Sequence, residues 1–502
     1  MTLAPNLRLP LNGSRILPLL LLAPLLLSAC NLFQPVPPKP NPDRTSNGEL
    51  DPIQPRRVLD PETGTYVIIQ NAPVERMDTI RWRDIPVNPD RIITSGTTEV
   101  FTGTQEPAAP QPTRLDSRPI NQEVNSEFFS VYNVVIALPF LTDRFSPNSN
   151  LPNGSEWALH FYGGSRLALE DLQAQGINLN VSVIDSRETS EPAAAQMVRT
   201  NADLQNAHLI IGPYRRETAR YLADLARTKD KTVMSPATTA NDVTSNNPNY
   251  VQVSPGLPTH CEAITRHILQ RYRPEQVVLV ARDKPEELER LAYFQNEYAR
   301  RQGTSAARRF RDFIVRDNAT DINNMNVLPL LQHDTTVIVV PSWSSETFIY
   351  SLMRKLDLAR KASTQIVIYG MPQWMDFEMI DYDYYERLNV HISNSTHINP
   401  LFNETQFFRR RFYDRYGAVP RPEGYMGYDL TLFCGRMLKK YGTKFQYYLE
   451  NEPTQMLHTR FEFERVVTPT TTSGTENLPI QRFENKYVNI LRFRDYQFRL
   501  AD

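Results

Sequence analysis

Short apolar runs that alternate with longer amphipathic segments dominate the chain after Tyr132. Residues 134–138, 180–185 and 208–213 are rich in Val and Ile, and the helix-like segments 157–175 and 193–204 separate them. Short continuous apolar strands separated by helices of about ten or more residues are typical of parallel strands buried on both faces. We therefore predict an α/β fold built on a doubly wound parallel sheet with helices on both faces.

The same alternation is found twice along the chain. A helix at 217–227 and a strand at 232–236 complete the first series, and a second series follows residue 254. Its strands are expected at 276–280, 310–315, 336–340 and 365–370, with helices at 259–270, 285–301 and 348–359. The chain then continues through a strand at 389–393, helices at 404–416 and 425–441, and strand-like segments at 461–463 and 487–500. The sequence thus predicts a two-lobed domain over 129–502, with lobe 1 at about 130–255 plus later crossover segments and lobe 2 at about 256–390.

The first thirty residues have the pattern of an export segment. Arg8 and Arg15 precede an apolar run from Ile16 to Leu27, and Ser28 and Ala29 lead from this run to Cys30. The run is too short for a spanning helix, and small residues before the end fit a signal peptidase site. This ending resembles the lipobox of bacterial lipoproteins, which implies a signal peptide over 1–29 and an acylated Cys30 as membrane anchor. The alternative is an ordinary secretory signal followed by an accidental cysteine.

The residues after Cys30 bear on the destination of such a lipoprotein. Residues 31–34 read Asn-Leu-Phe-Gln and lack both an aspartate directly after the cysteine and an acidic cluster. In lipoproteins those two features are linked to inner-membrane retention and to surface display. We therefore expect a periplasmic protein with its lipid anchor in the outer membrane, held stably if Cys30 carries more than one acyl chain.

Residues 30–128 have the composition of a tether. Prolines crowd this stretch together with Asn, Thr, Ser and Gln, which favours extended and solvated backbone. One part differs, because residues 65–69 and 78–82 have strand-like content and follow turn residues such as 61–64. We expect a short β segment near 65–82, which would dock on the chain's own domain or on a partner.

Charge and cysteine content exclude some classes of protein. The chain has 55 Lys and Arg against 56 Asp and Glu, a formal net charge of −1, so no basic field favours nucleic acid as a partner. Besides Cys30, only Cys261 and Cys434 remain, too few for a disulfide framework in a chain of this length. They are either buried free thiols or a single pair bridging distant elements.

Several local motifs lie in the order and spacing of a known family. They are residues 163–169, where two glycines precede an Ala-containing helix face, Asp185 after the second strand, the Ile-Gly-Pro turn 211–213, the Ser-Pro-Ala-Thr-Thr loop 235–239, and Gly-Tyr-Asp at 427–429. With these motifs the chain resembles the type I periplasmic binding proteins, the leucine-binding and receptor-ligand-binding family, over residues 132–441. The resemblance implies two α/β lobes and a ligand held between them.

The C-terminal stretch carries a second resemblance. Residues 474–477 and 487–493 look like the ending of Bacteroidetes envelope lipoproteins that have this fold, some of which are fused to peptidoglycan-binding LysM modules. No LysM module is evident in this chain.

In such a fold the ends of parallel strands and the starts of the following helices converge on the crevice between lobes, where backbone N–H groups suit an anion. The resemblance implies that hydroxyl residues of lobe 1 hold a ligand carboxylate. The matching loop contributes Ser235, Ala237, Thr238 and Thr239. Arg215 and Arg216 stand where relatives have a serine after the third strand.

In lobe 2, Trp343 falls where relatives place an aromatic residue that closes over the ligand. The acidic residue expected after Gly370 is replaced by a segment that contains Gln373 and Trp374. Read functionally, the arginines and tryptophans would suit an anionic ligand with a flat or sugar-like body. Read structurally, the arginines start a solvated helix and pair with Glu217, and the tryptophans fill the gap between lobes.

The motifs of common enzymes are missing from the chain. We find no phosphate loop, no His-Glu-x-x-His helix, no Cys-x-x-Cys pair and no Gly-x-Ser-x-Gly elbow. The eight histidines are scattered, and His391 and His397 lack an evident third ligand. We therefore predict no catalytic residue, no metal site and no cofactor.

These observations favour a lipid-anchored periplasmic protein that captures a small polar molecule, of amino-acid type or an anion, for an ABC transporter. The alternative is a non-catalytic envelope interaction protein that acts on peptidoglycan synthesis or other envelope machinery, which the long tether favours. A transporter permease or an envelope protein would be the respective partner.

Overall fold

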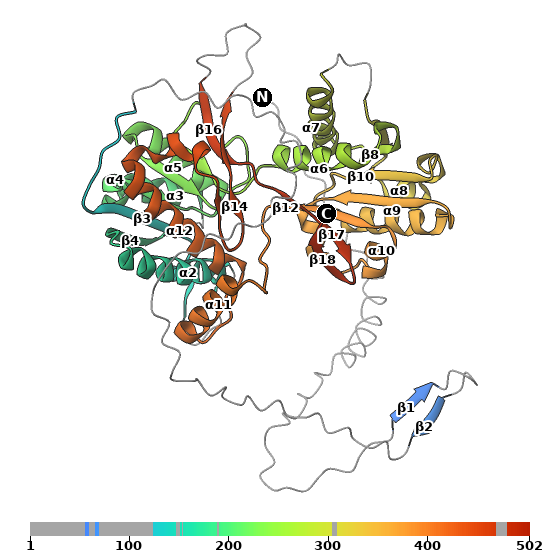
Figure 1. Cartoon of the computed structure of the whole chain (residues 1–502), viewed down its shortest axis with the longest axis horizontal. Coiled ribbons are helices and arrows are strands. Elements are labelled where there is room, and N and C mark those ends of the chain that lie inside the picture. The colour runs from blue at the N-terminus through green and yellow to red at the C-terminus, as the bar shows by residue number, and fades with distance from the viewer. Residues whose placement is uncertain are drawn as a thin grey trace, which may run out of the picture. The chain divides into compact units, whose positions relative to one another are not determined.

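A computed structural model describes residues 124–146, 151–152, 154–187, 190–303, 309–467 and 479–501, and the backbone of 56–59 and 66–69. The elements of residues 124–501 form two lobes, and Figure 1 labels many of these elements. In the described part of the chain, each lobe contains one seven-stranded, mostly parallel sheet. The predicted two-lobed α/β fold with helices around doubly wound sheets is therefore confirmed.

The lobe 1 sheet has the strand order β15-β16-β7-β6-β5-β3-β4. Its first five strands in the chain pair in parallel, as does β16 with β7, whereas β15 pairs with β16 in antiparallel fashion. The strands are β3 (Tyr132–Leu138), β4 (Leu179–Asp185), β5 (Leu209–Ile211), β6 (Thr232–Ser235), β7 (Tyr250–Gln252), β15 (Phe463–Val467) and β16 (Ile480–Asn485). The helical elements are η3 (Thr142–Arg144), α2 (Ser155–Ala174), α3 (Glu191–Thr200), α4 (Ala202–Asn206), α5 (Arg216–Lys229), α11 (Asn403–Tyr416), α12 (Pro422–Tyr441) and η7 (Gly442–Asn451), and a small hairpin pairs β13 (Thr454–Gln455) with β14 (Arg460–Phe461).

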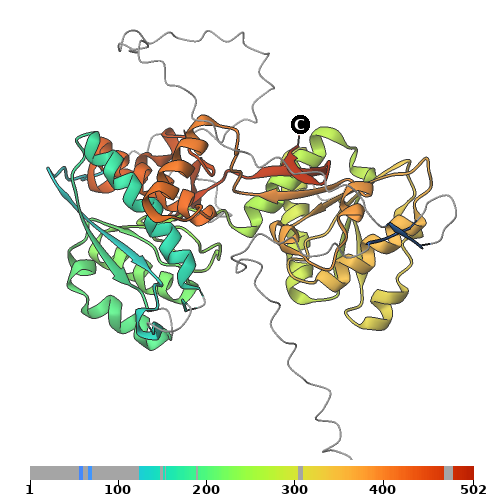
Figure 2. The same ribbon diagram turned by 90° about the horizontal axis from the view of Figure 1, so that it is seen from below.

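The lobe 2 sheet has the order β18-β17-β12-β11-β10-β8-β9, with β17 and β18 as antiparallel additions. Figure 2 shows these red C-terminal strands beside the orange strand of lobe 2. The strands are β8 (Val277–Arg282), β9 (Arg311–Val315), β10 (Thr335–Val339), β11 (Gln365–Gly370), β12 (Val390–Asn394), β17 (Asn489–Arg494) and β18 (Gln497–Leu500). The helical elements are α6 (Leu257–Arg271), η4 (Pro274–Gln276), α7 (Pro285–Gln302), α8 (Ala319–Asn324), η5 (Leu328–Leu330), α9 (Glu346–Ala359), η6 (Pro372–Asp376) and α10 (Tyr382–Arg387).

One predicted helix is divided in the structure. The sequence pattern favoured a single helix over 193–204, but α3 ends at Thr200 and α4 begins at Ala202. Asn201 has an extended backbone with ψ 117°, and its side chain accepts a hydrogen bond from the N–H of Leu204. Asparagine is a favoured N-cap because its side chain satisfies a free helical N–H group, so Asn201 ends one helix and starts the next.

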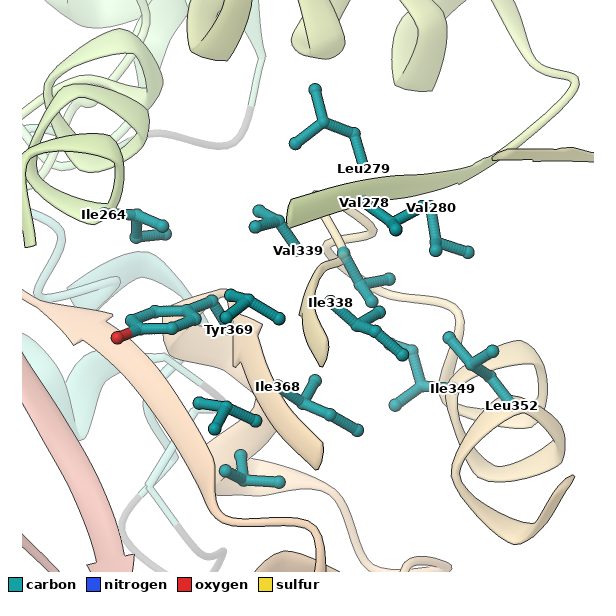
Figure 3. Packing of buried hydrophobic residues seen from close by; sticks show 14 of the residues in the cluster. Ile264, Val278, Leu279, Val280, Ile338, Val339, Ile349, Leu352, Ile368 and Tyr369 are labelled. Carbon is teal, nitrogen blue, oxygen red and sulfur yellow. The ribbon is translucent and has the colours of Figure 1, made fainter. Parts of the chain in front are cut away.

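The lobe cores consist of the strand side chains and the helices that cover them. In lobe 2, Val278, Ile338 and Ile368 from adjacent strands meet Ile349 and Leu352 of α9 (Figure 3). Cys261 belongs to this core and Cys434 to the core of lobe 1, and both are buried free thiols. Burial raises the pKa of both thiols, which keeps them protonated. The free-thiol alternative is thus confirmed.

Three connections in the described chain join the lobes: residues 253–256 between β7 and α6, 395–402 between β12 and α11, and 486–488 between β16 and β17. Two of them bring late segments back to lobe 1 and then to lobe 2, so neither lobe is continuous in sequence. Such crossings make a hinge on which two lobes can close.

Within residues 56–69, β1 (Arg56–Leu59) pairs with β2 (Tyr66–Ile69) in antiparallel fashion. β2 covers four residues of the predicted strand segment 65–69, and its partner lies before it in the chain. The other predicted segment, 78–82, lies outside the described residues, as do the predicted signal peptide, Cys30 and most of the predicted tether. Among the described helices, none is long and apolar enough to cross a membrane.

Candidate functional site

The predicted site residues lie on the loops that follow the parallel strands. In lobe 1 these loops follow β5 and β6, and in lobe 2 they follow β10 and β11. β5 and β6 are parallel neighbours, as are β10 and β11, so the two loops of each lobe leave its sheet at the same edge. Within each lobe, the fold therefore brings the predicted residues together.

The loop after β6 exposes its hydroxyl groups unequally. Ser235 is fully buried at the end of β6, and Thr238 is 5% exposed. The hydroxyl of Thr238 contacts the carbonyl of Tyr214 at 3.5 Å, which joins this loop to the one after β5. Ala237 is half-buried and Thr239 is exposed. Of the two loop threonines, Thr239 is thus the one with an accessible side chain.

Two motif residues hold the neighbouring loops in place. Gly212 has φ +122°, and a Cβ there would lie 2.1 Å from the carbonyl oxygen of Ala137, so only glycine fits this turn. The carboxylate of Asp185 accepts hydrogen bonds from the N–H groups of Leu141, Thr142 and Arg187. Burial raises the pKa of Asp185, but these bonds outweigh it and the pKa is lowered. Asp185 is therefore a loop-fixing residue.

Arg215 and Arg216 lie at the start of α5 and are exposed. The guanidinium of Arg216 forms an ion pair with Asp242 instead of the expected Glu217. The side chains of this pair are 45% and 67% exposed, so the structural interpretation of a solvated helix start fits Arg216.

In lobe 2, Trp374 is fully buried and belongs to the core. Its indole N–H donates to the carbonyl of Ser342 at 3.0 Å, and a Cβ on Gly370 would lie 2.4 Å from its ring. The Ser342 hydroxyl donates to Glu287 at 2.8 Å. Trp374 therefore supports the loop that carries Trp343 and has no surface to offer a ligand, which corrects its assignment as a stacking residue in the cleft.

Trp343 remains available at the end of β10. It is half-buried, and its ring meets that of His260 edge-on at a centroid distance of 6.5 Å. His260 is buried beside Ser393, and burial lowers its pKa to about 4. Gln373 is half-buried, and its side-chain oxygen has no hydrogen-bond donor among the described residues. Trp343 thus stands against a neutral imidazole.

A buried carboxylate ties the connections together. Glu484 on β16 accepts hydrogen bonds from the N–H of Gly256 at 2.9 Å and the hydroxyl of Thr259 at 2.7 Å. Arg482 donates to its other oxygen at 2.7 Å, and Lys486 lies 3.3 Å away. Burial opposes the charge, but Lys486 and Arg482 outweigh it and lower the pKa of Glu484 to about 2. This ion cluster joins the first and last connections between the lobes.

The Tyr-Asp motif at the start of the late helix also has a structural role. Asp429 is fully buried and accepts hydrogen bonds from the backbone N–H and the ring Nδ1 of His458. His458 lies in the turn between β13 and β14, and its carbonyl accepts the N–H of His397 at 2.7 Å. Asp429 therefore fixes this turn and the connection 395–402.

A family model described as "Receptor family ligand binding region" matches residues 162–458, which is more than half of the chain. The chain belongs to this receptor ligand-binding family. Its members of the type I periplasmic-binding-protein class are non-catalytic ligand-binding proteins. None of the curated proteins with which the chain was compared matches it.

Several solved structures share the two-lobed fold of this chain. A putative branched-chain amino acid ABC transporter protein from Rhodospirillum rubrum is 14% identical with a TM-score of 0.52, over 73% of this chain and 99% of its own. An ABC transporter substrate-binding protein from Desulfitobacterium hafniense is 15% identical with a TM-score of 0.51, over 74% and 100%. A branched-chain amino acid ABC transporter periplasmic ligand-binding protein from Burkholderia xenovorans is 13% identical with a TM-score of 0.51, over 74% and 94%.

Two aromatic residues near the lobe 1 loops of this family member were not predicted. Tyr214, 42% exposed, follows the Ile-Gly-Pro turn, and its ring lies 4.9 Å from that of Trp157. Trp157 stacks in turn on Phe161. The signal was present in the sequence, because Tyr214 directly follows a motif residue and Trp157 starts the first helix. Among the described residues, no group of three His, Cys, Asp or Glu side chains could hold a metal ion.

Proposed function

We propose that this chain captures a small polar solute of amino-acid type, or another small anion, between its lobes and delivers it to an ABC transporter. The observation that carries this proposal is the arrangement at the strand ends. Lobe 1 offers the exposed Thr239 on the loop after β6, which Thr238 joins to Tyr214 of the aromatic pair Trp157–Tyr214. Lobe 2 offers Trp343 on a loop that Trp374 holds. A hydroxyl with backbone N–H groups suits a carboxylate, and aromatic side chains can cover the body of the ligand.

The names of similar structures support the amino-acid class. By their names, the Burkholderia protein is a branched-chain amino acid ABC transporter periplasmic ligand-binding protein, and the Rhodospirillum protein is a putative branched-chain amino acid ABC transporter. Residues 371–374, directly after Gly370, contain no acidic residue, so we assign recognition of an ammonium group to an uncharged acceptor. The side-chain oxygen of Gln373 is our candidate for that role, since it has no donor among the described residues, but it is buried and must turn toward the cleft to meet a ligand.

Thermal unfolding of the chain from residue 121 onward tests the proposal. A ligand at about a hundred times its dissociation constant adds roughly 2.7 kcal/mol of stability, which raises the unfolding temperature by several degrees. We expect a shift with amino acids or small carboxylates, and none with sugars.

A double variant tests the cleft itself. Thr239→Ala with Trp343→Ala should weaken binding of the stabilising solute at least tenfold, because it removes a hydroxyl partner and an aromatic cover. The matched control is Ser344→Ala, an exposed hydroxyl next to Trp343 in the same loop. Undiminished affinity in the double variant would refute the cleft assignment.

We also propose that Cys30 carries a lipid that anchors the protein in the outer membrane, facing the periplasm. The lipobox-like residues 27–30 and the absence of an aspartate at position 31 support it. Cys30→Ser should move the protein from the membrane fraction to the soluble periplasmic fraction. Retention of the variant in the membrane fraction would contradict a lipid anchor at this residue.

A second candidate, an envelope interaction protein, is favoured by the Pro-rich residues 30–128, whose reach a transporter receptor does not need. If no solute class stabilises the chain, this candidate is preferred, and crosslinking in the native envelope should then yield a cell-wall protein.

A further inference from the structure

A cavity of about 700 Å³ lies beside the connection 395–402. Its walls come from α11 and α12, from the turn between β13 and β14, and from Asn489 and Leu500 of β17 and β18. None of the residues predicted for the cleft contributes to it. Its volume is in the usual range for small-molecule sites.

The walls of this cavity are largely apolar and aromatic. Phe407 and Phe408 of α11 face Leu432 of α12 and Met456 of the hairpin turn, and Leu500 forms part of the rim. Phe407 is 62% exposed and Leu500 is 51% exposed. Large apolar side chains that remain exposed around a cavity mark a binding surface, because covering them with an apolar molecule lowers the free energy.

Two arginines lie at the same end of the cavity. Arg411 donates to Asp171 of α2 at 2.8 Å, and Arg436 donates to the side-chain oxygen of Gln175, also of α2, at 3.0 Å. Asp171 and Gln175 are one helical turn apart, so the two bonds bring both guanidinium groups to the same end of α2. Both arginines line the cavity, whereas Asp171 and Gln175 lie behind them.

The acidic residues of the cavity do not neutralise this end. Asp429 is fully buried and bonded to His458, and Glu404 lies seven residues before Arg411 on α11, about 10 Å along the helix axis. Asp171 occupies one of the five N–H donors of Arg411, with Glu170 at 3.7 Å. No carboxylate of the described chain lies within ion-pair distance of Arg436. The guanidinium of Arg436 therefore supplies positive charge where the apolar walls end, and Arg411 offers N–H donors beside it.

We propose that this cavity is a second ligand site, which binds a molecule with an apolar body and a single carboxylate. Arg411 and Arg436 hold the carboxylate, and the body lies against Phe407, Phe408 and Leu432. A free α-amino acid fits less well, because its ammonium is adjacent to its carboxylate, whereas Glu404 lies at the other end of the cavity. The site is therefore distinct from the cleft in both position and ligand class.

Calorimetric titration of the full chain with octanoate tests the proposal. We expect saturable binding of octanoate, and binding at least tenfold weaker for octan-1-ol, octylamine and leucine. Octan-1-ol lacks the carboxylate, octylamine carries a positive charge in its place, and leucine adds an ammonium next to it. Arg436→Gln should weaken octanoate roughly tenfold, because it removes the charge but keeps an amide donor. The matched control is Arg409→Gln, an exposed arginine of α11 outside the cavity, which should bind as the parent chain does.

Leu500→Glu provides a second test that is independent of the arginines. This exposed position on the rim would place a carboxylate beside the ligand, so octanoate should bind at least tenfold more weakly. The cleft variant Thr239→Ala with Trp343→Ala should keep the affinity for octanoate, which separates the two sites. Absence of binding at millimolar octanoate, or equal affinity of the Arg436 and Leu500 variants with the parent chain, would overturn the proposal.

Discussion

The carboxylate of Glu484 couples stability to pH at the level of a single residue. Its pKa of about 2 in the folded chain lies below the ordinary value of 4.5. A lowered pKa means that the unfolded chain takes up the proton first, so the stabilisation is complete above about pH 4.5 and is lost as the pH falls toward 2. Glu484→Gln should cost about 3 kcal/mol of unfolding free energy at neutral pH, because Arg482 loses its buried partner.

Denaturant unfolding of the parent chain and the Glu484→Gln variant between pH 2 and 7 measures this effect. We expect the difference in unfolding free energy to shrink as the pH decreases and to vanish near pH 2. Glu156→Gln is the control, since its ion pair with Arg421 is more than half exposed and should contribute less than about 1 kcal/mol. A difference that stays constant over this range would contradict the role of Glu484.

At the level of elements, α2 and α12 pack backbone against backbone. A Cβ on Gly427 would lie 1.9 Å from the carbonyl oxygen of Phe161, and one on Gly164 would lie 1.8 Å from that of Gly424. Gly427→Ala should therefore separate the helices and cost about 3 kcal/mol, seen as a fall of several degrees in unfolding temperature. Gly435→Ala on the same helix should cost less, because the nearest atoms to its Cβ belong to the side chain of Leu172 and not to backbone. An unchanged unfolding temperature for Gly427→Ala would refute this account of the packing.

The same elements show how far sequence alone reaches. The parallel strands were predictable because each is a short Val and Ile run buried on both faces, as at 277–281 and 336–340. The division at Asn201 was missed because the apolar pattern of 193–204 continues across a capping residue. Trp374 was missed as a core residue because the space under Gly370 depends on tertiary packing. Glu484 was missed as well, although alternating charges at 482, 484 and 486 on a strand indicated ionic contacts on one face.

At the scale of the whole molecule, we expect the two proposed sites to be coupled through the hinge. The cavity that holds octanoate has walls from α11 and α12 in lobe 1 and from Asn489 and Leu500 in lobe 2. A molecule that contacts both lobes favours one angle between them, and closure of the cleft requires a change in that angle. Octanoate should therefore change the affinity for the cleft solute, by a factor of about 5 to 150 as is usual for coupled sites.

Calorimetric titration of the cleft solute, with and without saturating octanoate, measures this coupling. By linkage, the solute must change the affinity for octanoate by the same factor, so the reverse titration is an internal check. Arg436→Gln should restore the uncoupled affinity of the cleft at octanoate concentrations that saturate the parent chain, whereas Arg409→Gln should not. Equal affinities of the cleft with and without octanoate would mean that the cavity walls move as one body, and that the hinge does not lie between them.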